Sequence, residues 1–145
     1  MEATWTSGRG GAGGGKRAKG LKVSKEDRET NLRRRGDGAG RVTRNGVAVI
    51  RAAISPYAAV RDEVRARIGD FVEVHVDCSS PELTRRDVKG LYEKALRGEI
   101  KNFTGVSDPY EPPDTPEVTV STDRETAPQS TAVIVNWLEQ NGFLA

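Results

Sequence analysis

The sequence is poor in the residues that build disulfides and histidine-based sites. Its 145 residues include one cysteine, Cys78, and one histidine, His75. A single cysteine cannot form an intrachain disulfide, and neither residue has a second Cys or His at the spacing that zinc ligands need. We therefore expect no metal site of this kind, and we interpret His75 as a packed or edge side chain.

Long apolar runs are also absent. No stretch approaches the roughly 18 apolar residues of a membrane span, and no apolar segment follows the early charges as it does in a secretory signal. With 35% apolar and 30% charged residues, the composition is that of one soluble globular domain. We expect a reducing, cytoplasmic compartment and no membrane partner.

Charge and glycine are unevenly distributed along the chain. Residues 1–51 hold thirteen Lys and Arg against five Asp and Glu, whereas residues 52–145 hold ten against sixteen. Seven glycines fall within residues 1–20, and such a composition buries too little apolar surface to offset the entropy of ordering. We predict a disordered basic tail over 1–22 and a folded domain over 23–145. A basic tail can bind nucleic acid through phosphates, but we favour a solvated tail without that function.

The folded part alternates between strand and helix patterns. β-branched apolar runs at 47–54 and 71–77 predict strands that are buried on both faces of a parallel sheet. Between them, Val60, Val64 and Ile68 recur at fourfold spacing and place one apolar stripe on a helix. Strand, helix and strand together predict a βαβ unit and an α/β fold.

Further elements follow in the second half. We predict a helix over 81–96, a strand over 118–120 and a last helix over 127–140 that ends at an Asn-Gly pair. Prolines between 109 and 116 indicate an extended connector. The last helix is expected to turn four apolar residues toward the core: Val133, Ile134, Trp137 and Leu138.

Another helix is predicted to begin after Ser24. This serine is followed three residues later by Asp27, which is close to a helix-capping signature. Each glycine in a helix interior costs about 1 kcal/mol relative to alanine, so we expect the second half of this helix to be weak or frayed. The glycines concerned are Gly36, Gly38 and Gly40.

Four segments carry groups suited to a phosphorylated nucleotide: 27–34 (DRETNLRR), 54–57 (ISPY), 86–92 (RDVKGLY) and 100–105 (IKNFTG). Guanidinium groups offer planar forks that match phosphate oxygens. Segment 54–57 ends a predicted parallel strand, which is where open α/β sheets bind ligands. These segments therefore indicate a nucleotide site.

The four segments closely resemble those of the adenylyl-sulfate kinase family over about residues 24–142. This family uses ATP and Mg²⁺ to phosphorylate adenosine 5'-phosphosulfate (adenylyl sulfate) at its 3'-hydroxyl, giving 3'-phosphoadenylyl sulfate for sulfate activation. The resemblance implies the three-layer parallel-sheet fold of P-loop kinases and places Arg86 against the ATP adenine. It also implies that adenylyl sulfate is bound by Arg28, Asn31, Ile54, Ser55, Lys89, Asn102 and Phe103.

Several of these residues have structural interpretations as well. Ser55 is suited to cap a helix that begins at Pro56, and capping is compatible with ligand contact. The family serine is often assigned a phosphoserine role, but no activating base is identifiable near Ser55 in the sequence. Tyr92 and Phe103 are also suited to core packing, and for Leu91 we adopt that interpretation. Asn102 stands where the family usually has glycine.

Residues 10–17 (GGAGGGKR) approach the P-loop pattern Gly-x-x-x-x-Gly-Lys-Ser/Thr, but Arg17 replaces the hydroxyl residue that holds magnesium. Only eleven residues separate Lys16 from Arg28. That is too few for the helix, strand and Asp-Gly-Asp segment that the family has there. We therefore expect a truncated kinase domain whose P-loop half is missing.

Two functions follow from this interpretation. The first is an adenylyl-sulfate kinase that is inactive as this chain alone. The alternative is a non-catalytic nucleotide-binding or assembly module, completed by another polypeptide. The expected partners are ATP, adenylyl sulfate, a second copy of the chain, or a fused or separate sulfate adenylyltransferase; we do not expect nucleic acid.

Overall fold

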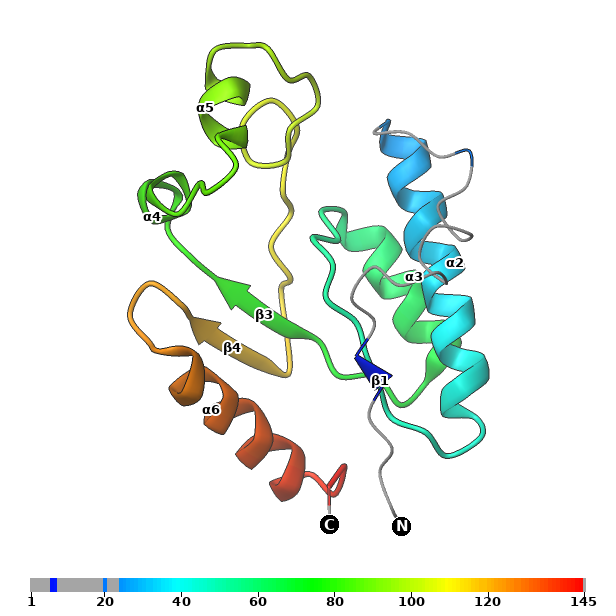
Figure 1. The fold of residues 1–145 in the computed structure, drawn as a ribbon. Coiled ribbons are helices and arrows are strands. Elements are labelled where there is room, and N and C mark those ends of the chain that lie inside the picture. Colours follow the sequence, from blue (N-terminus) through cyan, green and yellow to red (C-terminus); the bar gives the residue numbers. More distant parts are fainter. Residues whose placement is uncertain (1–5, 8–19, 21–23, 145) are drawn as a thin grey trace. The chain divides into compact units, whose positions relative to one another are not determined.

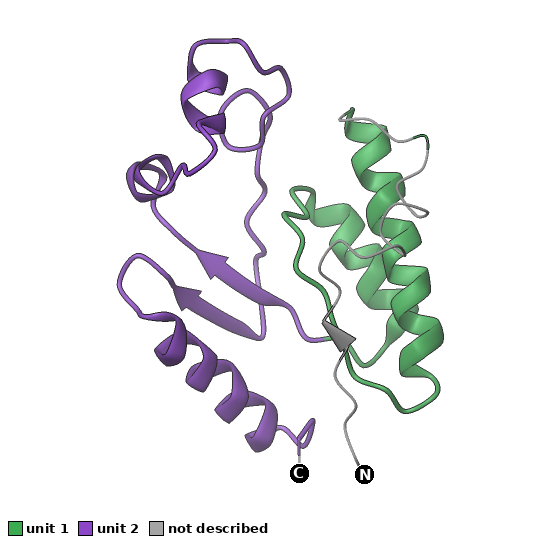
Figure 2. Cartoon of the chain, in the orientation of Figure 1, with its two compact units in different colours: residues 1–71 green, residues 72–145 purple. Residues whose placement is uncertain are grey.

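The computed structural model describes residues 6–7, 20 and 24–144 and divides the chain into two compact units, residues 1–71 and 72–145 (Figures 1 and 2). All strand pairings between the described strands are parallel, which confirms the α/β class. The tail predicted over 1–22 lies mostly outside the described residues and stays a prediction. Within it, Thr6–Ser7 form the short strand β1.

The first unit is built on two helices that lie side by side, α2 (Lys25–Thr43) and α3 (Ala58–Ile68) (Figure 1). Strand β2 (Val49–Ile50) pairs with β1 in parallel register. The predicted cap is confirmed, because the Ser24 hydroxyl accepts a hydrogen bond from the Asp27 amide at 3.2 Å. The apolar stripe is confirmed at its first position, since Val60 is only 2% exposed.

The expectation that α2 frays in its second half is wrong. The helix continues to Thr43, and Gly36 and Gly40 are buried where α2 meets α3. A Cβ atom on Gly36 would lie 2.7 Å from Val64 Cγ1, and one on Gly40 would lie 3.5 Å from Ile68 Cγ1. The missing side chains let the two helices approach closely, and the packing gained outweighs the low helix propensity of glycine.

Ion pairs along the outside of the same contact show the relative direction of the helices. Arg33 pairs with Glu63 at 2.8 Å, and one turn further along both helices Asp37 pairs with Arg67 at 3.2 Å. Residue numbers rise together on the two sides, so α2 and α3 run parallel. Their C-terminal ends therefore lie at the same end of the unit.

The second unit contains a parallel pair of strands, β3 (Val74–Asp77) and β4 (Val118–Ser121), with Val74 opposite Val118. Val120 is 1% exposed, and helix α6 (Ala127–Gln140) packs on β4. The predicted bounds of α6 are confirmed. Thr126 and Gln129 form a capping box at its start, and Asn141 caps its end. The helix faces are only partly as predicted, because Val133 is 45% exposed, whereas Ile134, Trp137 and Leu138 are half-buried.

Two other expectations are wrong. Strands β2 and β3 belong to different sheets, so they do not form the predicted βαβ unit. Strand β2 has two residues, Val49 and Ile50, which pair with Thr6 and Ser7 of β1. The helix predicted over 81–96 is two helices, α4 (Ser80–Arg85) and α5 (Leu91–Leu96), since Gly90 takes a left-handed φ of 63° between them.

Among the described residues, no helix combines the length and the apolar character needed to cross a bilayer.

Candidate functional site

The sequence-predicted site residues fall in both units, and each unit brings its own segments together. The first unit holds Arg28, Asn31, Ile54 and Ser55, and the second holds Arg86, Lys89, Asn102 and Phe103. The two groups are described separately.

In the first unit, the start of α2 lies beside segment 54–57. The Lys25 ammonium lies over the Tyr57 ring, 5.0 Å from its centroid, and Arg28 follows on the first turn of the same helix. The Asn31 side-chain carbonyl accepts a hydrogen bond from Arg35 Nε at 3.0 Å. Two motifs that are far apart in sequence thus share one end of this unit. Ile54 is 68% exposed there, and Ser55 is half-buried.

Ser55 does not cap a helix. Helix α3 begins at Ala58 with Tyr57 as its N-cap residue, so the predicted capping role of Ser55 is wrong. Its backbone instead has a φ of 44°, and its carbonyl accepts a hydrogen bond from Arg61 at 2.7 Å. A left-handed conformation at a non-glycine residue costs on the order of 1 kcal/mol or more, and such residues cluster at functional sites.

In the second unit, Arg86 is fixed against the carboxyl end of β4. Its guanidinium donates hydrogen bonds to the Glu82 carboxylate and, at 2.7 Å, to the backbone carbonyl of Thr122. Hydrogen bonds from Arg85, which has the larger effect, and from Arg86 lower the pKa of Glu82 to about 2. The carboxylate is therefore ionised at neutral pH, and it orients Arg86 at the strand end where α/β sheets bind ligands.

The turn that carries Lys89 is closed by Asp87. The Asp87 carboxylate accepts hydrogen bonds from three successive backbone amides of α5, those of Leu91, Tyr92 and Glu93, at 2.9, 2.7 and 3.2 Å. Lys89 itself is exposed. Leu91 is 40% exposed, so its predicted place in the core is wrong.

Phe103 packs against Tyr92. Their rings meet edge to face with centroids 4.9 Å apart, and both side chains are half-buried. Burial raises the pKa of the Tyr92 hydroxyl. Asn102 has a φ of 55°, a conformation that asparagine tolerates and glycine adopts freely, so the usual family glycine and this asparagine suit the same backbone.

His75 and Cys78, which we did not expect to bind a metal ion, are both packed side chains. His75 is half-buried and stacks on Tyr110 with ring centroids 6.3 Å apart, which confirms its interpretation as a packed residue. Cys78 is free and half-buried. Within the part of the chain that the structure describes, no group of three or more His, Cys, Asp or Glu side chains is placed to hold a metal ion.

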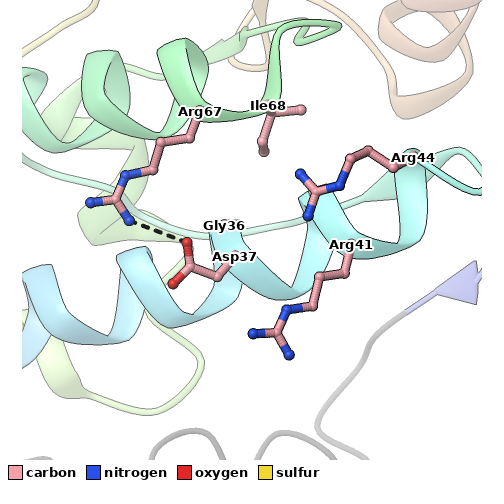
Figure 3. Close-up of a pocket in the computed structure, with 7 residues that line it drawn as sticks. Gly36, Asp37, Arg41, Arg44, Arg67 and Ile68 are labelled. Atoms are coloured by element: carbon pink, nitrogen blue, oxygen red, sulfur yellow. Dashed lines mark hydrogen bonds and ion pairs between the residues drawn. The ribbon is translucent and has the colours of Figure 1, made fainter.

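The first unit contains a hollow with a volume of about 320 Å³, which the sequence did not predict (Figure 3). Its arginines are explained by the helices around it. The parallel helices α2 and α3 both end here, and their last carbonyls carry partial negative charge that nearby cations neutralise. Arg67 also pairs with Asp37. We therefore assign the hollow no ligand. It is lined by Gly36, Asp37, Gly40, Arg41, Arg44, Arg67 and Ile68.

Known proteins are similar to this chain in both sequence and fold. A model of the adenylylsulphate kinase family matches residues 15–121. An adenylyl-sulfate kinase of Rippkaea orientalis is 57% identical over 127 residues, which are 88% of this chain and 70% of that protein. A probable bifunctional SAT/APS kinase of Sorangium cellulosum is 56% identical over 127 residues, but the chain spans only 22% of its length.

Solved structures agree. The APS kinase of Mycobacterium tuberculosis in complex with AMPPNP and APS is 38% identical and has a TM-score of 0.75, with 87% of this chain and 77% of that chain covered. A hexameric APS kinase from Thiobacillus denitrificans is 28% identical with a TM-score of 0.66, covering 99% of this chain and 23% of that chain.

Proposed function

This chain belongs to the adenylylsulphate kinase family, and we propose that it binds adenylyl sulfate and serves the ATP-dependent phosphorylation of that nucleotide at its 3'-hydroxyl. The observation that carries the proposal is the 57% identity to an adenylyl-sulfate kinase over 127 residues that include all four nucleotide-site segments. A related APS kinase has been solved with AMPPNP and APS, which supports both an ATP site and an adenylyl sulfate site.

We assign the residues by motif. On the first unit, Arg28 would face the phosphosulfate, because a guanidinium pairs well with sulfate and phosphate oxygens. On the second, Lys89 would reach adenylyl sulfate, and Phe103 would stack on its adenine. Arg86, held by Glu82 and Thr122, would present its flat cation to the adenine of ATP. The remaining contacts to adenylyl sulfate are assigned to Asn31, Ile54, Ser55 and Asn102.

The donor set does not fit the magnesium ion that the family uses. Residues 10–17 have Arg17 where a P-loop would have its magnesium-binding hydroxyl, so we do not count them as a P-loop, and the described residues bring no three carboxylates, histidines or cysteines together. We therefore assign no Mg²⁺ ligand and route no step through the ion. For the same reason we expect no ADP release from this chain alone in a coupled assay with ATP and adenylyl sulfate.

Binding tests the proposal where turnover is not expected. Calorimetric titration with adenylyl sulfate should show saturable binding. Phe103→Ala should weaken it by about 1–3 kcal/mol, the usual value of base stacking on an aromatic ring. Lys89→Ala should also weaken binding, whereas Lys94→Ala, an exposed lysine on α5, should not. Absence of binding by the unmodified chain would refute the proposal.

We also infer that a polypeptide that carries a P-loop completes the enzyme, and that the chain associates with a second copy of itself or with a sulfate adenylyltransferase. The hexameric relative and the bifunctional SAT/APS kinase relative support this inference. Light scattering of the purified chain tests self-association. Completion in trans would raise ADP release above the rate that an added P-loop-bearing family member shows without this chain. A cytoplasmic location remains a prediction from composition.

A further inference from the structure

We propose that Asp87 is a positioning residue for adenylyl sulfate: its carboxylate holds the turn that carries Lys89 and the first turn of α5, so that Lys89 and Phe103 are both presented to the nucleotide. The inference rests on the proposed function and deepens it. It assigns a role to the one residue of segment 86–92 that bonds to successive backbone amides rather than to other side chains.

Asp87 closes the turn in two ways, with its backbone carbonyl and with its side-chain carboxylate. Its backbone carbonyl accepts a hydrogen bond from the Gly90 amide at 3.1 Å, and its carboxylate accepts from Leu91, Tyr92 and Glu93. The N-cap residue of α5 is Gly90, which has no side chain to cap the helix. Asp87 therefore satisfies amides that would otherwise have no partner at the start of a helix.

Helix α5 depends on this contact more than a longer helix would. It is six residues long, and an isolated helix of that length is not stable in water. A carboxylate at the N-terminus also interacts favourably with the partial positive charge of the helix end. The side chains of the turn contribute little packing, because Val88 is 97% exposed and Lys89 is also exposed.

The same contact reaches Phe103 through Tyr92. The Tyr92 amide makes the shortest of the three hydrogen bonds to Asp87, 2.7 Å, and the Tyr92 ring supports the Phe103 ring edge to face. On the other side of the ring pair, the Phe103 amide donates to the Ser107 hydroxyl at 2.9 Å. One carboxylate thus fixes the backbone that follows Lys89 and the backbone of Tyr92, whose ring contacts Phe103.

The first experiment measures the contact itself. Amide hydrogen exchange in Asp87→Ala should be about tenfold or more faster at Leu91, Tyr92 and Glu93, the scale expected for loss of a helix cap. Amides of α6 should be unchanged. Asp114→Ala is the matched control, because Asp114 is an exposed aspartate in the connector of the same unit. Asp87→Asn keeps the shape and one acceptor oxygen, so its effect should be intermediate.

The second experiment measures positioning. Asp87→Ala should weaken adenylyl sulfate binding by about tenfold, and Asp87→Asn should restore part of it. In a Lys89→Ala, Phe103→Ala background, Asp87→Ala should cost little further affinity, since groups that act through one another are not additive. A role in overall stability alone would leave its effect the same in both backgrounds.

The outcomes separate the two proposals. A wild-type chain that binds no adenylyl sulfate would overturn the proposed function and the positioning role with it. A wild-type chain that binds, together with an Asp87→Ala variant that binds equally well, would overturn the positioning role only. Unchanged exchange at Leu91, Tyr92 and Glu93, or an undiminished effect in the double-variant background, would also overturn it.

Discussion

Replacing Gly36 by alanine tests the close packing of α2 on α3. The new Cβ would lie 2.7 and 2.9 Å from the two Cγ atoms of Val64, well inside van der Waals contact. Val64 is β-branched and stiff at χ1, so its methyl groups cannot swing away cheaply. Overpacking of this kind costs about 1–3 kcal/mol, against a gain of about 1 kcal/mol in helix propensity. We expect a net loss in the free energy of unfolding of up to about 2 kcal/mol.

Gly40→Ala is the matched control on the same helix face. Its Cβ would lie 3.5 Å from Ile68 and 3.6 Å from Arg44, which is ordinary contact. This variant should therefore gain about 1 kcal/mol from helix propensity. Urea unfolding of both variants, and of Gly36→Ala combined with Val64→Ala, measures the difference. If Gly36→Ala stabilised the chain as much as Gly40→Ala, or if Val64→Ala brought no relief, the packing argument would be refuted.

Three further predictions concern caps, charge and backbone. Thr126→Ala removes the capping box of α6 and should lower the free energy of unfolding by about 0.5–2 kcal/mol in urea titrations, whereas Thr126→Ser should not. Because folding lowers the pKa of Glu82 from 4.5 to about 2, ionised Glu82 stabilises the folded chain above pH 4.5, and this stability is lost as the pH falls toward about 2. In acid unfolding experiments, the free energy of unfolding of Glu82→Gln should lack this dependence on pH. Asn102→Gly should leave stability unchanged or raise it by up to about 1 kcal/mol, while Asn102→Val should lower it by about 1–3 kcal/mol in the same assay, because φ is 55° there.

Features set by neighbouring residues could be predicted from the sequence. The start of α2 follows from Ser24 and Asp27, and the end of α6 follows from Asn141 and Gly142, because each cap involves groups within one turn. Strand β4 was also predicted, over 118–120; in the structure it spans Val118–Ser121, pairs with the distant strand β3, and its buried residues alternate. The two caps need no knowledge of the rest of the chain.

Features set by distant partners could not be predicted. The predicted strand over 47–54 holds seven apolar residues and Arg51. In the structure two of them, Val49 and Ile50, pair with β1, which lies more than forty residues earlier in the chain. Helix propensity likewise gives only the free-energy cost of Gly36 in an isolated helix. It does not include the packing of Val64 against Gly36, which is possible only because glycine has no side chain. Gly36 and Gly40 lie four residues apart and therefore on one face of the helix, which indicates close packing that helix propensity does not describe.

Backbone strain supports the candidate site without reference to any resemblance. Among the described residues, two non-glycine residues have positive φ, Ser55 at 44° and Asn102 at 55°. Both are among the residues that the family resemblance assigns to adenylyl sulfate. Strained conformations cost about 1–3 kcal/mol each and persist where the surrounding structure enforces them, most often at functional sites. Asparagine reduces that cost, but serine does not, so Ser55 carries the stronger argument: its conformation is held by Arg61 on one side and by buried Pro56 on the other.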